Sequence, residues 1–206
     1  MTRHMSVAIT GASGALYGIR LLQLLLQQHV HVSLMISSPA RVVIATETNY
    51  SFPSNPEQLV MYLAKELKFD PVLLNIYSKN QWLAPVASGS AAPEAMIICP
   101  CSTGTLSAVA NGSSRSLIER AADVMLKERR QLILVPRETP LSSVHLENML
   151  KLSNHGVTIL PAMPAFYHKP VGISGLVDFV VARILDHVRV GHTLVKPWGS
   201  VQDESS

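Results

Sequence analysis

Short apolar runs alternate with longer segments of helical periodicity along most of the chain. The apolar runs are continuous and do not alternate with polar residues, which is typical of parallel strands covered on both faces. We expect strands at residues 5–10, 30–36, 72–77, 95–99, 132–135 and 157–160. We expect helices at residues 15–28, 57–67, 116–129, 139–154 and 176–188, and two more that start near residues 38 and 103. This alternation predicts an α/β fold with a mostly parallel sheet between two layers of helices.

Two of these helix starts depend on local signals. Ser38 followed by Pro39 fits an N-cap and a first helical position, and Thr139 followed by Pro140 repeats the pattern. No internal repeat and no linker divides the chain. We therefore expect a single domain over residues 1–195, followed by a C-terminal tail at residues 196–206.

Charged residues are scarce in this chain. They make up 15% of its 206 residues, against about 25% in an average soluble domain. A surface with so few charges is often covered by copies of the same chain, so we expect a homo-oligomer. The net charge of +3 is too small and too dispersed to suggest a nucleic-acid partner. No apolar run approaches the roughly 18 residues that span a membrane, and the first residues do not resemble a signal peptide.

The two cysteines, Cys99 and Cys101, are separated by a single residue. A disulfide across one residue would be badly strained, and two sulfurs without histidines nearby are too few for a zinc site. We therefore expect two buried thiols in a protein of the reducing cytoplasm.

In open α/β sheets, ligands bind beyond the carboxyl ends of the strands. The first predicted strand is followed by T-G-A-S-G at residues 10–14, with Gly18 about one helical turn further on. Glycines let the backbone approach an anion, amides at the helix start point toward it, and Ser13 adds a hydroxyl. The segment lacks the spacing of G-x-G-x-x-G and the lysine of the P-loop. A phosphate cradle is therefore one interpretation, and a tight turn without a ligand is the other.

Polar groups also follow three other strands. The second strand ends in Ser37 and Ser38, where an NAD-binding fold would have an acidic residue. Hydroxyls and a glycine come at residues 102–105, and Arg137 and Glu138 follow the strand at 132–135. This convergence favours an organic ligand with phosphate and hydroxyl groups.

Several other charged and aromatic residues have both a functional and a structural interpretation. Arg120 and Lys127 are seven residues apart and so lie near one helix face, which is either a binding face or a solvated one. Arg183 is either a surface residue or turned inward toward an anion. Glu47 follows an apolar run, so a buried carboxylate with a raised pKa competes with an ordinary surface residue. Trp82 precedes a loop of small residues and is either a core residue or a site residue.

Metal catalysis and hydrolysis by a Ser-His-Asp triad are disfavoured. No pair of histidines has the spacing of a metal site, and Ser142 and His145 have no acidic residue at an orienting position. The chemistry we expect involves an organic anion, in particular a phosphate ester, held by arginine, lysine and tyrosine.

Five ordered motifs together resemble the UbiX flavin prenyltransferase family. They are T-G-A-S-G-A-x-Y-G-x-R-L-L at residues 10–22, P-C-S-T-G-T-L at 100–106, R-A-A-D-V-x-L-K-E-R-R at 120–130, R-E-T-P-L at 137–141 and P-A-F-Y at 164–167. The similarity runs from about residue 5 to residue 188. It implies a three-layer Rossmann-like flavoprotein fold that binds FMN and assembles into a dodecamer.

The resemblance also implies a reaction. A dimethylallyl group would pass from dimethylallyl monophosphate to N5 and C6 of reduced FMN without a metal ion. The product, prenylated FMN, would serve a UbiD-type decarboxylase, usually in ubiquinone biosynthesis.

Residue roles follow from the same resemblance. FMN would be held by Gly11, Ala12, Ser13, Ser37, Ser102, Thr103, Gly104, Thr105 and Arg137. The donor phosphate would be held by Lys127, Tyr167 and Arg183, with Arg120 reaching across from a neighbouring subunit. Glu138 would be an acid/base group at that phosphate, and Trp82 would offer its ring face to the allylic cation. Glu47 and Ser13 would handle protons around the flavin.

The chain departs from the family at residues 113–116, which read S-S-R-S where members carry Asp or Asn followed by Asn. Ser116 can still cap the following helix, so the departure concerns a subunit contact. Two other functions stay open. A flavin-dependent decarboxylase of the phosphopantothenoylcysteine type has no special use for Lys127, Glu138 and Arg183, and a non-catalytic flavin carrier needs only the FMN residues.

Overall fold

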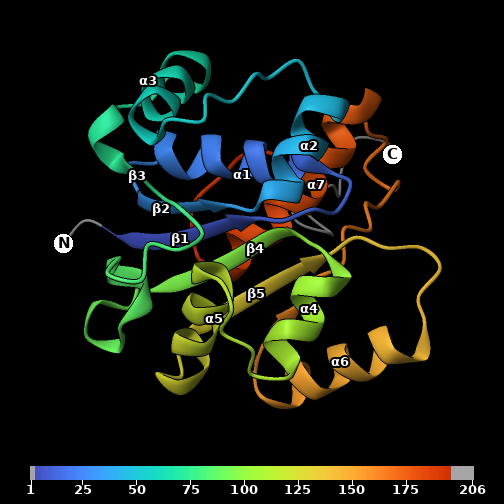
Figure 1. Ribbon diagram of the computed structural model, residues 1–206. Coiled ribbons are helices and arrows are strands. Elements are labelled where there is room, and N and C mark those ends of the chain that lie inside the picture. Colours follow the sequence, from blue (N-terminus) through green and yellow to red (C-terminus); the bar gives the residue numbers. More distant parts are fainter. Residues whose placement is uncertain (1–2, 196–206) are drawn as a thin grey trace.

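Six parallel strands form one sheet within residues 3–195, the part of the chain that the computed structural model describes (Figure 1). The strands are β1 (His4–Ile9), β2 (His31–Ile36), β3 (Leu74–Tyr77), β4 (Ala95–Cys101), β5 (Gln131–Pro136) and β6 (Thr158–Ile159). Their order across the sheet is β3-β2-β1-β4-β5-β6, and every pairing is parallel. The predicted parallel α/β sheet is confirmed. The predicted tail at residues 196–206 lies outside the described residues.

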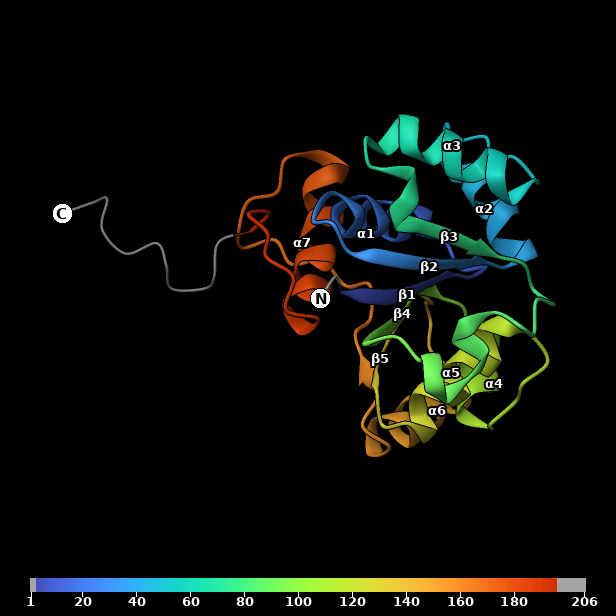
Figure 2. The same ribbon diagram turned by 90° about the vertical axis from the view of Figure 1, so that its left-hand side faces the viewer.

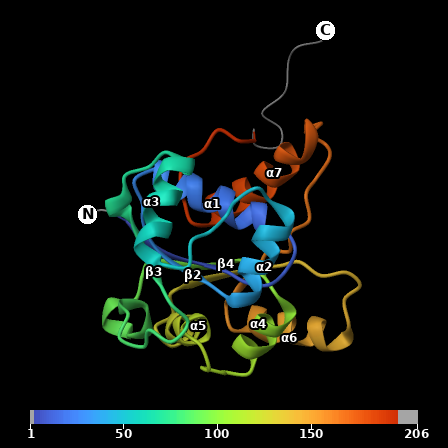
Figure 3. The same ribbon diagram turned by 45° about the horizontal axis from the view of Figure 1, so that its top comes forward.

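Helices cover both faces of the sheet (Figures 1 and 2). One face carries α1 (Ala15–Gln27), α2 (Ser38–Glu47), α3 (Pro56–Leu67) and α7 (Gly172–His187). The other carries α4 (Thr103–Ala110), α5 (Leu117–Lys127) and α6 (Ser143–Asn154). Figure 3 shows α1 and α7 side by side, and the two helices are in contact. The expected three-layer arrangement is therefore present.

The two faces of the sheet have separate hydrophobic cores. In β1, Val7 and Ile9 belong to the core under α1 and α7, whereas Ala8 belongs to the core under α4 and α5. Successive side chains of a strand point to opposite faces, so a strand covered on both sides is apolar at most positions, with Ser6 and Ser33 as buried polar exceptions. This explains why the strands read as continuous apolar runs and not as alternating ones.

Two helix starts were predicted at the wrong residue because of their caps. α6 begins at Ser143 and not at Thr139–Pro140. Ser142 and His145 form a capping box there, in which Ser142 Oγ accepts the His145 amide at 3.3 Å and His145 Nδ1 accepts the Ser142 amide at 3.2 Å. The N-cap of α2 is Ser37, one residue before the predicted cap, and its Oγ accepts the Ala40 amide at 3.2 Å.

Other boundaries differ as well. α7 begins at Gly172, four residues before the predicted start. β3 is shorter than predicted because Pro71–Leu73 form a single 3-10 turn before it. The start of α5 is as expected, since Ser116 Oγ accepts the Glu119 amide at 3.3 Å.

β1 lies between β2 and β4, and from there the chain adds strands outward first on one side of β1 and then on the other. We call this place the reversal point of the sheet. The loops after β1 and β4 therefore leave the sheet side by side and lead to helices on opposite faces, a place where doubly wound sheets bind ligands. Between residues 3 and 195, no helix is long and apolar enough to cross a membrane. Cys99 and Cys101 are both free thiols and both buried, as predicted.

Candidate functional site

The loop between β1 and α1 is held by a carboxylate from another helix. Gly14 is the N-cap of α1, in the left-handed region at φ 105°, and it has no side chain with which to cap the helix. Glu47, the last residue of α2, replaces that cap: its Oε2 accepts the amides of Gly14 at 2.8 Å and Ala15 at 3.0 Å. The amide groups at the start of α1 are thus partly satisfied by a residue 33 positions away.

These contacts decide the protonation of Glu47. Desolvation raises the pKa of Glu47, but interactions with the Ser13 hydroxyl, the Ala15 and Gly14 amides and the nearby Arg137 outweigh it, so the pKa lies below its ordinary value. Of the two interpretations of Glu47, the buried carboxylate with a raised pKa is wrong. The residue is exposed and is a carboxylate at neutral pH.

Thr10 connects this loop to the one after β4. Its hydroxyl donates to the Pro100 carbonyl at 2.9 Å and accepts the Ser102 amide at 2.8 Å. Ser102 then caps α4, because its Oγ accepts the Thr105 amide at 3.3 Å and lies 3.0 Å from Thr105 Oγ1. The two loops at the reversal point are therefore fixed relative to each other by the buried Thr10.

Glycines in this region serve two different purposes. A Cβ on Gly11 would lie 2.5 Å from Cβ of Pro39, and one on Gly18 would overlap the Cys99 carbonyl oxygen, so both positions permit close packing of the chain. A Cβ on Gly104 would meet no atom within 4 Å among the described residues. Packing therefore does not require glycine at position 104, although a helix interior disfavours it.

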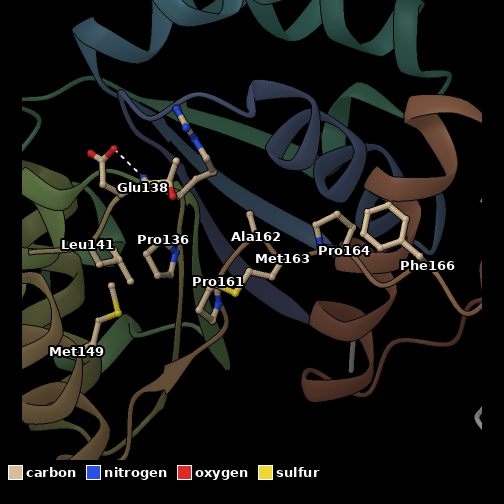
Figure 4. Close-up of a pocket in the computed structure, with 11 residues that line it drawn as sticks. Pro136, Glu138, Leu141, Met149, Pro161, Ala162, Met163, Pro164 and Phe166 are labelled. Carbon is tan, nitrogen blue, oxygen red and sulfur yellow. Dashed lines mark hydrogen bonds between the residues drawn. The ribbon is translucent and has the colours of Figure 1, made fainter.

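Arg137 and Glu138 follow β5, and Arg137 reaches the loop between β1 and α1. Arg137 Nε donates to the Ser13 carbonyl at 3.1 Å, and the Glu138 carboxylate accepts the Thr139 amide at 3.0 Å. Both residues also line a cavity, and Figure 4 shows Glu138 among the residues around it. That cavity, of about 370 Å³, is bounded by residues such as Leu141, Met149 and Phe166. We call Ser13, Glu47, Arg137 and Glu138 the loop cluster.

A second cavity lies at the carboxyl ends of β2 and β3. It has a volume of about 220 Å³ and is lined by Ser37, Tyr77, Thr105 and Ile118, among others. The cavity therefore brings the end of β2 next to the start of α4, so the Ser37 and Thr105 hydroxyls line the same space.

Tyr167 belongs to a group of three rings, in which Tyr167 and His168 precede α7 and Phe179 lies on it. The His168 and Phe179 rings are stacked at 5.2 Å, and the Tyr167 ring meets both edge-on, at 5.7 Å and 5.8 Å. Arg183 lies four residues after Phe179, on the same stripe of the helix. The structure therefore places Tyr167 about one helical turn from Arg183.

Arg120 and Lys127 lie on the opposite face of the sheet from α7, on α5. Arg120 binds the Asp123 carboxylate at 2.8 Å and donates to the Ala87 carbonyl at 3.1 Å. Lys127 forms an ion pair with Glu128. Lys127 ends α5 at the amino end of β5, whereas Glu138 follows its carboxyl end, on the order of 20 Å away for a strand of this length. Within one chain, Lys127 and Glu138 therefore do not meet.

The sequence did not draw attention to residues 88–90, S-G-S, which lie against these cations. A Cβ on Gly89 would lie 2.8 Å from Lys127 Nζ and would overlap the Glu128 carboxylate. The hydroxyls of Ser88 and Ser90 are 3.1 Å apart and exposed. The signal was present in the loop of small residues at 83–93, where two serines flank a glycine. We call Arg120, Lys127 and residues 88–90 the α5 cluster.

Trp82 lies in the segment between β3 and the α5 cluster. Its side chain is 47% exposed and its neighbour Leu83 is 99% exposed. Trp82 is therefore not a core residue, and it leaves a ring available at the surface on the α5 side of the molecule.

No cluster of three or more metal-ligating side chains exists within residues 3–195. The structure instead offers hydroxyls, glycines and a guanidinium at the reversal point of a parallel sheet. The family model described as Flavoprotein matches residues 1–185 of the chain. Fold, site and match together define a flavoprotein.

Comparison with known sequences and structures narrows the class of flavoproteins to one family. The chain is 54% identical over 204 residues to the flavin prenyltransferase UbiX of Pseudomonas aeruginosa, covering 98% of both chains. It resembles the crystal structure of AnUbiX in complex with FMN and dimethylallyl pyrophosphate, with a TM-score of 0.86 and 40% identity over 98% of this chain and 100% of that one. The crystal structure of a dodecameric FMN-dependent UbiX-like decarboxylase from Escherichia coli O157:H7 gives a TM-score of 0.84 at 40% identity. The match covers 96% of this chain and 100% of that one. The chain belongs to the UbiX flavin prenyltransferase family.

Proposed function

We propose that this chain transfers a dimethylallyl group from dimethylallyl monophosphate to N5 and C6 of reduced FMN, without a metal ion. The observation that carries the proposal is the loop cluster, in which Arg137 binds the Ser13 loop at the reversal point of the sheet and Glu138 follows it directly. The prenylated FMN would pass to a UbiD-type decarboxylase. The free thiols of Cys99 and Cys101 suit the cytoplasm as the site of the reaction.

The residues at the reversal point fit FMN. The Ser37 and Thr105 hydroxyls line one cavity, and the N-terminal turn of α4 adds amide groups suited to a phosphate. Gly104 leaves room beside that turn, since a Cβ there would meet no atom of the described chain. We assign the flavin to Gly11, Ala12, Ser13, Ser37, Ser102, Thr103, Gly104, Thr105 and Arg137. When bound and reduced, FMN supplies the nucleophilic nitrogen and carbon that accept the prenyl group.

The donor phosphate needs more than one copy of the chain. Tyr167 and Arg183 lie on the α7 side of the sheet, and Arg120 and Lys127 on the other side. A phosphate held by all four residues must therefore lie between copies, with the α5 cluster of one copy facing the loop cluster of another. This requirement supports a homo-oligomer, and we propose the dodecamer that the E. coli relative forms.

The chain's own groups account for the movement of protons and charge. The bond between the allylic carbon and the phosphate oxygen breaks, and the electron pair leaves with the phosphate. Glu138 donates a proton to that oxygen, and the surrounding cations stabilise the charge without a metal. Trp82 of a neighbouring copy faces the allylic cation. The bond to N5 would replace the N5 hydrogen, and the bond to C6 would form as the alkene of the prenyl group takes up a proton. The hydrogen on C6 would leave as a proton that Glu47 accepts through Ser13, since its lowered pKa keeps it ionised.

Mass spectrometry of the flavin tests the proposal. The purified protein is incubated with reduced FMN and dimethylallyl monophosphate, and the flavin is then released and weighed. We expect the mass to rise by one dimethylallyl group less one hydrogen, because the two bonds replace the hydrogens on N5 and C6 while the alkene of the prenyl group takes one up. An unchanged flavin in folded, FMN-loaded protein would overturn the proposal and leave a carrier or a decarboxylase. A parallel incubation with dimethylallyl pyrophosphate shows which donor is used.

A further inference from the structure

A series of hydrogen bonds runs from His192, beyond the end of α7, through Asp186 to Arg183 on the helix. Arg183 Nη1 donates to one Asp186 oxygen at 2.7 Å, and the other Asp186 oxygen lies 3.0 Å from His192 Nε2. His192 Nδ1 accepts the Leu194 amide at 3.3 Å. Because an amide can only donate, Nδ1 is the acceptor, so the proton of the neutral ring is on Nε2 and points at Asp186.

Burial decreases steadily along this series toward Arg183. The His192 side chain is 10% exposed, whereas Asp186 and Arg183 are about half exposed, at 47% and 53%. An exposed arginine–carboxylate pair by itself contributes little and fixes little. Here the carboxylate is held from behind by a buried imidazole, and Leu194 packs against the core. The orientation of an exposed guanidinium is thereby tied to the interior.

The helix α7, which carries Asp186 and Arg183, is itself anchored at its end. Arg3 donates to the carbonyls of Val188 at 2.6 Å and Arg189 at 2.8 Å, just beyond the end of α7, and it also pairs with Glu94 beside β4. Arg20 of α1 binds Asp178 at 2.7 Å on the same helix. The position of α7 therefore does not depend on the Arg183–Asp186 pair.

We propose that His192 and Asp186 are positioning residues for Arg183, which they hold ready for the donor phosphate. This inference rests on the proposed function, because it takes Arg183 to be a phosphate ligand. Asp186 uses only one terminal nitrogen of Arg183, so the rest of the guanidinium stays available for an anion on the Tyr167 side of α7. A side chain fixed in advance loses less conformational entropy when the phosphate binds.

The test compares variants of the full-length, FMN-loaded protein. We expect Asp186→Ala and His192→Phe to raise KM for dimethylallyl monophosphate by about three- to tenfold, the range for losing one ordered side chain, with kcat nearly unchanged. Calorimetry should show the same loss of affinity for the donor without turnover. His192→Gln keeps an amide donor near the Nε2 position, so it should restore most of the affinity. Flavin content and melting temperature are measured for every variant.

Asp178→Asn is the matched control, because it breaks an ion pair on the same helix that does not involve Arg183. It should leave KM unchanged, even where it lowers the melting temperature as much as Asp186→Ala does. If wild-type protein transfers the prenyl group while Asp186→Ala and His192→Phe keep its KM, the inference is wrong and the proposed function stands. A lower KM in Asp186→Ala would also overturn it, since Asp186 would then compete with the phosphate. If the wild type transfers nothing, it is the proposed function that fails.

Discussion

The loop cluster and the α5 cluster differ in how their polar groups are bound. In the loop cluster, two of the contacts join residues far apart in sequence: Glu47 accepts the Gly14 amide 33 positions away, and Arg137 donates to Ser13 across 124 positions, while Glu138 accepts the amide of its neighbour Thr139. In the α5 cluster, Arg120 pairs with Asp123 and Lys127 with its neighbour Glu128. The first arrangement exists only when the sheet is folded, whereas the second is mostly local to one helix.

This difference suits two kinds of ligand. The loop cluster is fixed by the fold and can present a prearranged surface to a flavin that stays in place. The ion pairs of the α5 cluster are between one-third and one-half exposed, and such pairs contribute little to stability. Their acidic partners can therefore be exchanged for an incoming phosphate at small cost. We therefore expect substitutions in the loop cluster and in the α5 cluster to differ in their effects on prenyl transfer, FMN binding and stability.

The largest expected effect is at Glu138, in the loop cluster. Glu138→Gln should slow prenyl transfer by about 10² to 10⁴, the usual contribution of a positioned acid, while FMN stays bound. Single-turnover mass spectrometry of the flavin measures the rate. Glu147→Gln, an exposed carboxylate of α6, is the control and should react like the wild type. Wild-type turnover in Glu138→Gln would refute the assignment of the acid.

Lys127 tests whether the clusters meet between copies. Lys127→Ala should slow transfer by about 10², the order found when one stabilising group is removed from a developing charge. Oligomers assembled from equal amounts of Lys127→Ala and Glu138→Ala copies should have about a quarter of their sites active. In such a random mixture, about a quarter of the interfaces combine an intact Lys127 from one copy with an intact Glu138 from the other. If transfer in the mixture is no faster than in either variant alone, the two residues do not share a site between copies. Lys151→Ala, an exposed lysine of α6, is the control for charge.

Two glycines separate packing from ligand binding in the loops. Gly18→Ala should lower the free energy of unfolding by about 1–3 kcal/mol, because the new methyl overlaps the Cys99 carbonyl. Gly104→Ala meets no protein atom and should raise stability by up to about 1 kcal/mol, since alanine favours the helix. We expect Gly104→Ala alone to combine undiminished stability with weaker FMN binding. Denaturant unfolding of the FMN-free protein and flavin fluorescence titration measure the two quantities, and unchanged FMN affinity in Gly104→Ala would remove α4 from the flavin site.

The smallest expected effect is the pH dependence of the Glu47 cap. Because folding lowers the pKa of Glu47 below its ordinary value of 4.5, the cap stabilises the fold above that pH. This contribution is lost as the pH falls through the lowered value. Glu47→Gln should therefore be about 1 kcal/mol less stable than the wild type at pH 7, a modest figure because the residue is exposed. The difference should vanish in acid, and a difference that persists there would point to packing.

The fold was predictable because burial on both faces leaves a clear trace in sequence. Strands such as residues 95–99 had to be apolar at every position, and each was found near its predicted place. The start of α6 was not predictable from Thr139 and Pro140, because the cap depends on a reciprocal bond between Ser142 and His145. That pair, considered and rejected as hydrolase residues, is a structural cap.

The candidate site was predictable only in part. Residues at strand ends converge because parallel strands end at one edge, so Ser13, Ser37 and Arg137 could be grouped from sequence. The capping role of Glu47 could not be, because it depends on how α2 ends beside α1. The separation of Lys127 from Arg183 also needed the structure, since helical spacing says nothing about which face of the sheet a helix covers. The roles assigned to these residues stay predictions until the variants are measured.

The two buried thiols allow the rate at which the sheet opens to be measured by chemical labelling. Cys99 and Cys101 are the chain's two cysteines, and both are fully buried at the carboxyl end of β4. Burial raises the pKa of Cys101 to about 12 and that of Cys99 further still, so almost no thiolate forms near neutral pH. A thiol reagent can therefore label the chain only when β4 opens. Without any added cysteine, the labelling rate would report how often β4 opens beside the loops of the proposed flavin site, and how far a bound flavin slows that opening.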